Sequence, residues 1–365
     1  MESTSFHETS HECYHLPQVR FWVTFNEPYM FCVFGHGHGR LGATRVNPGT
    51  SEYLCGHHIL LAHARAYRAY QQSFSHQGGK VGLTLEDFYT VPDSQKAEDV
   101  LAAEVHQQFQ LGWFLDPILA GDYPELMRQR VGANGAAGGG RAASRLPTFT
   151  EAERRLLAGA LDFLGLNVYF GWRARHGVPV GAADPSVERD AAYTIIGTAD
   201  QFLPPGPFRS TPWAVRRSLG WVRKRYGREL PIIITENGFG DDGAEGLQDE
   251  ARIGYLQDHL REVMRAVHED RHNIKGYFVW CLLDDFEWGA GYKSKFGLVH
   301  VDFESGTLNR TPKASLLFYK RVIEHRMLAD DAVATGPSSS SSSSRPFDVR
   351  MLVVAVVGSM LCARA

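Results

Sequence analysis

Five short apolar runs, each followed at a distance by an amphipathic helical pattern, constrain the fold of this chain more than any other feature of its sequence. The runs are nearly continuous in apolar residues rather than alternating, which is typical of parallel strands covered on both faces. They lie at residues 19–25, 81–86, 163–169, 231–236 and 276–283. The helical patterns lie at residues 51–74, 94–109, 150–158, 212–226, 249–268 and 311–325. This order of elements predicts an α/β fold with a parallel sheet.

Local sequence signals place the ends of some of these elements. Ser94 is expected to be the N-cap of its helix, and residues 150–153 (TEAE) have the form of a capping box. Residues 132–145 (GANGAAGGGRAASR) contain little apolar bulk and many glycines. Such a segment cannot bury enough surface to offset its loss of chain entropy, so it is predicted to be a flexible surface loop inserted into the fold.

Charge and composition exclude several classes of protein. The 365 residues carry a formal net charge of -3, with 22% charged and 44% hydrophobic residues. These values are typical of a globular protein and exclude extensive disorder. The near-neutral balance provides no basic surface for nucleic acid and no field that would hold the chain at an anionic membrane. Aromatic residues make up 12% of the chain, which suits stacking against flat apolar ligand faces.

The five cysteines are Cys13, Cys32, Cys55, Cys281 and Cys362. Their odd number, their wide spacing and the lack of a C-x-x-C pair argue against a disulfide framework and against a thiolate zinc site. Buried free thiols are therefore predicted.

The two ends of the chain differ in composition from the rest. The first 18 residues are polar and rich in histidine, without the apolar run of a secretory signal peptide. Seven serines at 338–344 lead to an apolar stretch at 351–361, and eleven residues are too few for a transmembrane helix. The tail loosely matches a lipid-anchor signal, so membrane association through it is a second, weaker interpretation.

We therefore expect three regions: a polar segment at 1–18, a folded unit at 19–328, and a serine-rich linker with a short apolar tail at 329–365. The compartment stays open. The protein would be secreted or membrane-anchored if further sequence precedes Met1, and cytoplasmic otherwise.

Two carboxylates stand where predicted strands end. Glu27 follows the first run beside Asn26, and Glu236 ends the fourth. In parallel α/β folds, reactive groups gather at the carboxyl ends of the strands. Cleavage of a glycosidic bond needs two carboxyl groups, one protonated to assist the leaving oxygen and one ionised to attack the sugar or stabilise its positive charge. The alternative is two ordinary exposed glutamates.

The segment after the fifth run adds support for a sugar-binding cleft. It contains Trp280, Glu287 and Trp288. Aromatic faces stack on the C–H surfaces of sugars, and carboxylates accept hydrogen bonds from their hydroxyl groups. Taken together with the two glutamates, these residues favour carbohydrate as the ligand.

The sequence around these residues resembles glycoside hydrolase family 1, the retaining β-glucosidases and their lactase-like relatives. The segments TFNEP (24–28) and ITENG (234–238) are similar to the two signature segments of that family. Further segments fit the family in order, at residues 56–70, 112–127, 162–169, 211–227, 275–288 and 295–303, so the resemblance covers about residues 18–328. It implies a (β/α)8 TIM barrel in which residues 19–25 correspond to the fourth strand. Because 18 residues are too few for three βα units, we expect an N-terminally truncated, incomplete barrel with strands 4–8.

The resemblance also implies roles for individual residues. Glu27 corresponds to the general acid/base and Glu236 to the nucleophile in a double-displacement hydrolysis of β-glucosides or β-galactosides. Tyr169 corresponds to the phenol that hydrogen-bonds the nucleophile. The implied substrate-binding residues are Asn26 at the sugar 2-hydroxyl, Asn167, Trp280 beneath the glycone, Glu287 and Trp288 at its outer hydroxyls, and Phe296 in the pocket wall. No cofactor and no metal are implied.

Several family residues have no counterpart in this sequence: the glycone-binding glutamine near the first strand, the arginine beside the nucleophile after the second, and the histidine–tryptophan pair after the third. The arginine beside the nucleophile belongs to the strands that would precede residue 19, and without it Glu236 would lose a neighbour that keeps it ionised. Two alternatives to an active enzyme therefore stay open: a klotho-like module that binds glycan or protein, and a partial isoform with no stable fold of its own.

Two histidine-containing strings are not expected to bind metal. Residues 7–11 (HETSH) match the H-E-x-x-H pattern of zinc proteases, but they lie in a polar stretch without the apolar helix face that this pattern needs. Residues 36–39 (HGHG) are predicted to form a loop beside the mouth of the site.

Overall fold

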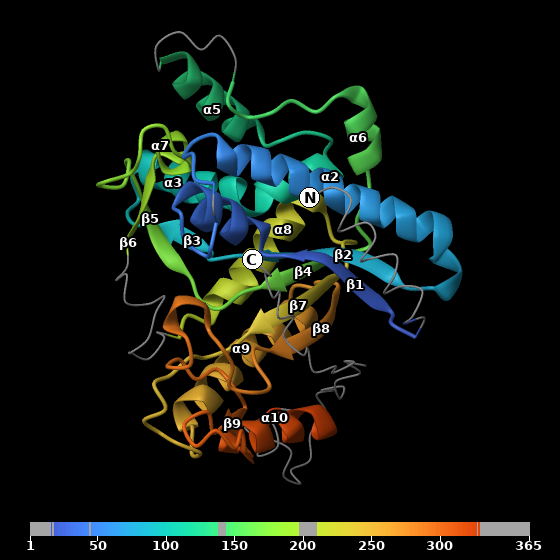
Figure 1. Ribbon diagram of the computed structural model, residues 1–365, viewed down its shortest axis with the longest axis vertical. Helices are drawn as coiled ribbons and strands as arrows, with labels where there is room; N and C mark the ends of the chain where they lie inside the picture. Colours follow the sequence, from blue (N-terminus) through green and yellow to red (C-terminus); the bar gives the residue numbers. More distant parts are fainter. Residues whose placement is uncertain are drawn as a thin grey trace, which may run out of the picture.

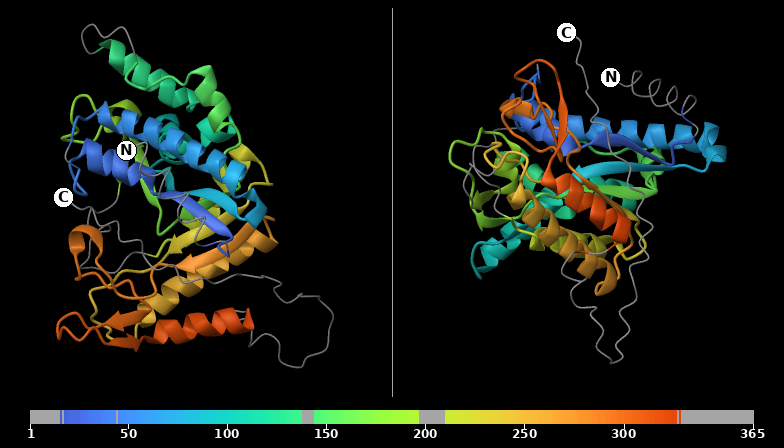
Figure 2. Two further views of the ribbon diagram at one scale, coloured as in Figure 1. Left: turned by 45° about the vertical axis from the view of Figure 1, so that its right-hand side comes forward. Right: turned by 90° about the horizontal axis from the view of Figure 1, so that it is seen from below.

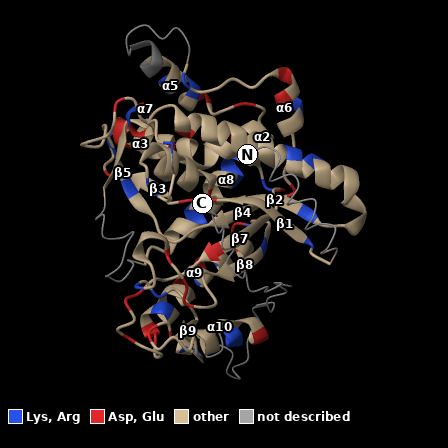
Figure 3. Cartoon of the chain, viewed as in Figure 1, with Lys and Arg blue, Asp and Glu red and all other residues tan. Residues whose placement is uncertain are grey.

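The computed structural model describes residues 18–43, 45–137, 144–196 and 210–326, together with residues 16 and 328, and for residues 134–137 the backbone alone. The string at 7–11 and the tail beyond residue 328 lie outside the described residues. Within them, no helix is both long and apolar enough to cross a membrane. Basic and acidic residues are interspersed over the elements in view (Figure 3), in keeping with the near-neutral net charge.

Five parallel strands form the main sheet and confirm the five predicted runs (Figures 1 and 2). In sheet order they are β1 (Phe21–Asn26), β2 (Lys80–Glu86), β4 (Phe163–Asn167), β7 (Ile232–Asn237) and β8 (Ile274–Val279). Every pairing between them is parallel. The carboxyl ends of the five strands therefore lie along one edge of the sheet.

Helices cover this sheet and account for the predicted helical patterns. They are α2 (Ser51–Ser73), α3 (Ala97–Gln107), α6 (Glu151–Leu157), α8 (Trp213–Tyr226), α9 (Glu250–His268) and α10 (Ala314–His325). The predicted capping box is present at α6. The hydroxyl oxygen of Thr150 accepts from the N–H of Glu153 at 3.3 Å, and the Glu153 carboxylate accepts from the N–H of Thr150 at 2.8 Å.

Two predicted helix starts are wrong. Ser94 is not the N-cap of α3, because its hydroxyl group donates to the carboxylate of Asp99 and Lys96 occupies the N-cap position. The last helix begins later than predicted, because part of that pattern forms strand β10 (Arg310–Pro312), which pairs with β9 (Val299–Val301).

The predicted loop at 132–145 is also wrong in its first part. Helix α5 (Glu125–Ala137) continues through residues 132–137. Alanine is the best helix former, and the alanines of this segment offset the low helix propensity of its glycines. Residues 138–143 lie outside the described part of the chain.

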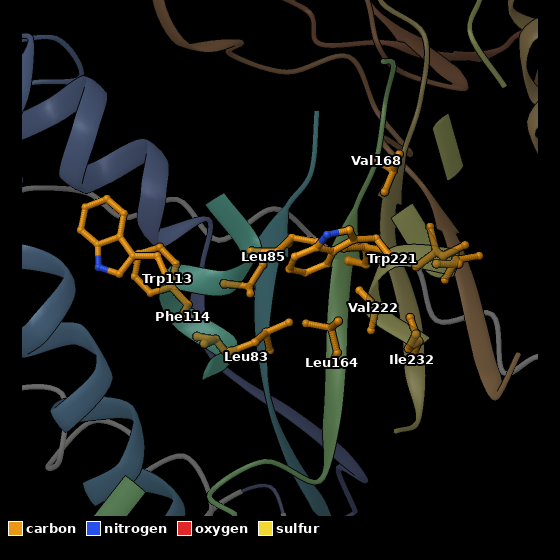
Figure 4. Close-up of a cluster of buried hydrophobic side chains, with 14 of the residues drawn as sticks. Leu83, Leu85, Trp113, Phe114, Leu164, Val168, Trp221, Val222 and Ile232 are labelled. Carbon is orange, nitrogen blue, oxygen red and sulfur yellow. The ribbon is translucent and has the colours of Figure 1, made fainter. Parts of the chain in front are cut away.

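The core lies between one face of the main sheet and the helices that cover it (Figure 4). Leu83 and Leu85 of β2 and Leu164 of β4 are fully buried there. They belong to one cluster with Trp113 and Phe114 at the start of α4 (Trp113–Leu119) and with Trp221 and Val222 of α8. Because side chains alternate along a strand, Thr84 and Glu86 of β2 lie on the opposite face.

Strand β1 departs from the prediction that both faces of each strand are covered. Phe21 and Val23 are 43% and 44% exposed. Among the described residues, β1 and β8 each pair with a single neighbour in the main sheet, so this sheet is open at both edges and does not close into a barrel.

A smaller sheet was not predicted. It consists of β3 (Thr90–Pro92), β5 (Trp172–His176) and β6 (Tyr193–Ile196) in that order. These strands are short, and β5 carries two arginines and a histidine in the sequence WRARH. These three strands therefore contain no long apolar run of the kind that marks the main sheet, and a search for such runs does not find them.

The prediction of free thiols is wrong for Cys32 and Cys55. They form a disulfide with Cα atoms 5.4 Å apart, which joins the π-helical segment η1 (Met30–Gly37) to α2. Their spacing along the chain carries no signal of this contact, because the contact depends on how η1 packs against the helix. Cys281 is a buried free thiol, as predicted. The other two cysteines lie outside the described residues.

Candidate active site

The predicted acid/base and nucleophile both lie at the carboxyl edge of the main sheet, whose strands are labelled in Figure 1. Glu27 directly follows β1, and Glu236 is the penultimate residue of β7. Strands β2 and β4 lie between these two strands in the sheet. The site therefore spans four neighbouring strand ends, as the position of catalytic residues in parallel α/β folds predicts.

Glu27 is held in an unusual backbone conformation. Its φ of 50° lies in the left-handed region that residues other than glycine rarely adopt. Its backbone N–H donates to the carbonyl oxygen of Thr84 on β2 at 3.0 Å, next to an irregularity in the β1–β2 pairing between Val23 and Asn26. Pro28 follows and cannot continue the ladder. Such local distortion redirects a side chain away from the strand's regular alternation.

Asn167, at the end of β4, connects the two halves of the site. Its Nδ2 atom donates to Oε1 of Glu27 at 2.7 Å and to Oδ1 of Asn26 at 3.1 Å. Its Oδ1 atom accepts from the hydroxyl group of Thr235 on β7 at 2.6 Å. The side chain of Asn167 is completely buried. One amide group thus fixes residues from three strands relative to one another.

Tyr169 contacts the second carboxyl group. Its hydroxyl group donates to Oε2 of Glu236 at 2.7 Å. The backbone of Tyr169 is also fixed, because the hydroxyl group of Tyr255 on α9 donates to the backbone oxygen of Tyr169. The position of the phenol is therefore set by the packing of α9 against the end of β4, and the contact expected between Tyr169 and Glu236 is present.

Burial raises the pKa of both glutamates. For Glu27, desolvation raises the carboxyl pKa and the hydrogen bond from Asn167 opposes the rise. For Glu236, desolvation and the charge of Glu27 raise the pKa well above its ordinary value, and the hydrogen bond from Tyr169 opposes this. Two buried carboxyl groups close enough to interact hold protons more tightly than either would in water.

No lysine or arginine among the described residues forms an ion pair with Glu236. A nucleophilic carboxylate must be ionised, and a nearby cation is the usual means of keeping it so in a buried site. Desolvation and the charge of Glu27 therefore raise the pKa of Glu236 with no ion pair among the described residues to offset them.

Trp280 and Glu287 form a second group beside the two glutamates. The indole Nε1 of Trp280 donates to Oε2 of Glu287 at 3.2 Å. Burial, followed by the charge of Asp285, raises the pKa of Glu287 to about 7. Gly238 allows this arrangement, because a Cβ atom at that position would lie 1.7 Å from the backbone oxygen of Trp280. The glycine of ITENG is thus required for the close approach of the segments after β7 and β8.

The remaining predicted residues lie at the rim and wall of this group. Trp288 is 44% exposed and makes an edge-to-face contact with Phe31, with ring centroids 6.3 Å apart. Phe296 is buried and packs edge-to-face against Tyr169 at 6.3 Å. Exposed indole at the rim and buried aromatic rings below it suit the stacking of a sugar.

Sequence reasoning missed two buried acids at the end of β2. Glu86 pairs in register with Asn167 and is 1% exposed. Asp87 follows it and accepts from Nε2 of Gln107 at 3.1 and 3.2 Å. Burial raises the pKa of Asp87 to about 7 and that of Glu86 well above its ordinary value. Both residues end a predicted strand, so the rule that located Glu27 would have found them too.

Other features of the described residues lie away from Glu27 and Glu236. A recess of about 750 Å³ lies between α8 and α9 and is lined mainly by basic residues, including Arg216, Arg217, Arg223, Lys224 and Arg228. It contains none of the predicted site residues. No cluster of histidine, cysteine and acidic residues in the described part of the chain has a metal-binding arrangement. His38, in the HGHG string, pairs with Glu188.

Comparison with known proteins agrees with these features. The family model of glycosyl hydrolase family 1 matches residues 4–327. Beta-glucosidase 40 of Arabidopsis thaliana is 36% identical over 328 residues, which cover 83% of this chain and 62% of that protein. Lactase/phlorizin hydrolase of Homo sapiens is 38% identical over 327 residues, which cover 88% of this chain and 17% of that protein. The chain thus spans less than two thirds of the length of these curated relatives.

Solved structures give the same result for the fold. An aphid myrosinase superimposes with a TM-score of 0.80 at 34% identity, covering 89% of this chain and 70% of the myrosinase. A β-glucosidase of the fungus Humicola insolens, solved in complex with glucose, gives a TM-score of 0.77 at 31% identity, covering 88% of this chain and 69% of the enzyme. These structures have the (β/α)8 TIM-barrel fold, and the five strands of the main sheet here match part of it. The chain therefore belongs to glycosyl hydrolase family 1.

Proposed function

We propose that the protein is a retaining β-glycosidase that hydrolyses β-glucosides or related β-glycosides, with residues 19–328 as its glycosidase unit. The observation that carries this proposal is the linked pair of strand-end carboxyl groups. Glu27 is held by Asn167, and Glu236 is held by Tyr169, at the carboxyl edge of one sheet. The names of the relatives, which include β-glucosidases and lactase/phlorizin hydrolase, support the substrate class.

The two glutamates would act in sequence. Protonated Glu27 gives its proton to the glycosidic oxygen while the carboxylate of Glu236 attacks the anomeric carbon from the opposite face, so the aglycone leaves and a glycosyl ester forms. Glu27, now ionised, then takes a proton from water. The water oxygen attacks the same carbon, releases Glu236 and gives a sugar with its original anomeric configuration.

The surrounding residues would bind the sugar in this proposal. Asn26 and Asn167 would hydrogen-bond hydroxyl groups next to the reacting carbon, and Trp280 would stack under the ring. Glu287 and Trp288 would contact the outer hydroxyls, with Phe296 in the wall behind Tyr169. The raised pKa of Glu27 suits a group that must begin the reaction protonated.

Hydrolysis of a chromogenic aryl β-glucoside tests the proposal. We expect Glu236→Gly to abolish turnover and added azide or formate to restore it, because a small anion can replace the missing carboxylate. Glu304→Gly is the matched control, since Glu304 is exposed in the loop after β9. Turnover by Glu236→Gly equal to that of the control would reject the nucleophile. A chain that binds glycan tightly but never turns it over would favour the klotho-like alternative.

A further inference from the structure

We propose that the recess between α8 and α9 binds a small anion that carries two or more phosphate or sulfate groups. None of the residues that line the recess belongs to the group around Glu27 and Glu236, so the proposal does not depend on glycoside hydrolysis. The volume of about 750 Å³ falls within the range of about 300–1,000 Å³ that is usual for small-molecule sites. Five basic side chains line it, against two acidic ones, Glu262 and Asp270.

The basic residues of α8 that line the recess lie on one face of the helix. Successive residues of an α-helix are about 100° apart around its axis. The residues that fall within about one third of the circumference on this basis are Arg216, Arg217, Gly220, Arg223 and Lys224. Gly220 lies between the two basic pairs, and a Cβ atom there would meet nothing within 4 Å. The missing side chain of Gly220 therefore leaves the floor of the recess open.

The two acidic side chains of the recess already have basic partners. Asp270 accepts from Nε of Arg216 at 2.6 Å, and its backbone oxygen accepts from Arg223. Glu262 accepts from Arg265, one turn further along α9, at 2.6 Å. Both carboxylates are therefore paired with groups other than the three remaining cations of the recess.

These three cations are Arg217, Lys224 and Arg228. All three are exposed, and none of them forms an ion pair within the described part of the chain. A cation in the last turn of a helix stabilises the helix dipole, which accounts for Lys224. Arg217 lies in the second turn of α8, away from that end, so the dipole does not account for it. The recess thus offers cationic groups that a bound anion can pair with.

His272 reports the electrostatic field inside the recess. It lines the recess and is 8% exposed. Burial lowers its pKa, and the charges of Arg223 and two further arginines lower it more, against the opposing charge of Asp270. An anion bound beside these cations would offset their charge, so the pKa of His272 should rise when the recess is occupied.

The spacing of the cations favours a ligand with more than one anionic group. Arg217 and Lys224 are two helical turns apart, about 10 Å along the axis of α8. Phosphate and sulfate groups accept several hydrogen bonds at once, and arginine pairs with phosphate in bidentate geometry. The whole chain carries a net charge of -3, so no long-range field attracts a nucleic acid, whose affinity depends on many phosphate contacts.

Calorimetric titration of the full 365-residue chain with inorganic tripolyphosphate tests the site. We expect saturable binding of one anion per chain, with an affinity that falls as salt is added. Gly220→Glu should weaken binding by about tenfold or more, because it places a like charge where the anion binds and where the backbone leaves room for it. Gly254→Glu is the matched control, since Gly254 of α9 is exposed, also has open space at its Cβ position and does not line the recess.

A second variant tests the cations themselves. Arg217→Gln combined with Lys224→Gln should weaken binding by about 2- to 30-fold, the combined effect of two exposed ion pairs. Lys320→Gln combined with Arg321→Gln makes the same change in net charge at exposed positions of α10 and should leave the affinity unchanged. In proton NMR titrations, tripolyphosphate should raise the pKa of His272 in the wild type by more than in the Arg217→Gln/Lys224→Gln variant.

Each outcome decides the proposal. Equal affinity of the wild type and Gly220→Glu, an equal loss in Gly254→Glu, or the absence of saturable binding overturns it. If Gly220→Glu fails to fold, the double variant and the His272 titration decide in its place. Tighter binding of sucrose octasulfate than of tripolyphosphate would assign a sulfated ligand to the recess, and the reverse order a phosphorylated one. Tighter binding of a short DNA duplex than of either would reject the small anion.

Discussion

Replacement of Tyr169 by phenylalanine isolates the contribution of one hydrogen bond to Glu236, the proposed nucleophile. The bond runs from the phenol to Oε2 of Glu236 at 2.7 Å. Phenylalanine keeps the ring that packs edge-to-face against Phe296, and it keeps the backbone oxygen that Tyr255 holds. The variant therefore removes a donor from Glu236 without removing the packing around it.

The size of the expected pKa shift follows from the negative charge on the acceptor, the carboxylate of Glu236. A hydrogen bond to an ionised group contributes about 1.5–3 kcal/mol, and about 1.4 kcal/mol corresponds to one unit of pKa. Since the bond favours the carboxylate, its loss should raise the pKa of Glu236 by about one to two units. Burial and the charge of Glu27 already raise that pKa, so loss of the phenol would make Glu236 still harder to ionise.

The rate of aryl β-glucoside hydrolysis as a function of pH provides the assay. The acid limb of kcat/KM should move up by about one to two pH units in Tyr169→Phe, with a loss of about 10- to 100-fold on that limb. Tyr123→Phe is the control, because the phenol of Tyr123 contacts His57 at 2.9 Å in another part of the fold. A Tyr169→Phe acid limb at the position of the control would refute the reasoning.

Three further predictions concern stability. Cys55→Ser should lower the free energy of unfolding by about 3 kcal/mol in guanidinium titrations, since the disulfide joins residues 23 apart, and reductant should abolish this difference. Glu287→Gln should raise the melting temperature at pH 8 and leave it unchanged at pH 4. The pKa of Glu287 is about 7 in the folded state and about 4.5 in the unfolded state, so ionisation of Glu287 destabilises the fold as the pH rises between these two values. Gly238→Ala should cost about 3 kcal/mol or prevent folding, because its Cβ atom would meet the backbone of Trp280, whereas Gly289→Ala, with open space at its Cβ position, should melt within a few degrees of the wild type.

The sequence predicted the main sheet well because its strands are apolar enough to be recognised without knowledge of their neighbours. The run that became β7 is buried at Ile232, Ile233 and Ile234, and its hydrophobicity alone identifies it. The polar strand β5 has no such signal, because it gains its place by pairing with β6 and by burying alternate side chains. A period-two pattern of only five residues is too short to distinguish from a loop.

For the candidate site, the sequence located the carboxyl groups at the strand ends but not the groups that donate hydrogen bonds to them. The strand-end rule identifies residue types at one edge of a sheet, so Glu27 and Glu236 could be located. Which donors those carboxyl groups receive depends on side-chain geometry across strands, as with the amide of Asn167. Glu86 ends the strand β2 and satisfies the same rule, but its burial could not be read from the sequence.

The proposed retaining mechanism requires Glu236 to ionise before Glu27, and burial by itself raises the pKa of both carboxyl groups. The order must therefore come from what each group touches. Tyr169 favours the anion of Glu236, and Asn167 favours the anion of Glu27. The phenol of Tyr169 donates to Glu236 and the amide of Asn167 donates to Glu27, so the balance between these two hydrogen bonds sets which carboxyl group ionises first.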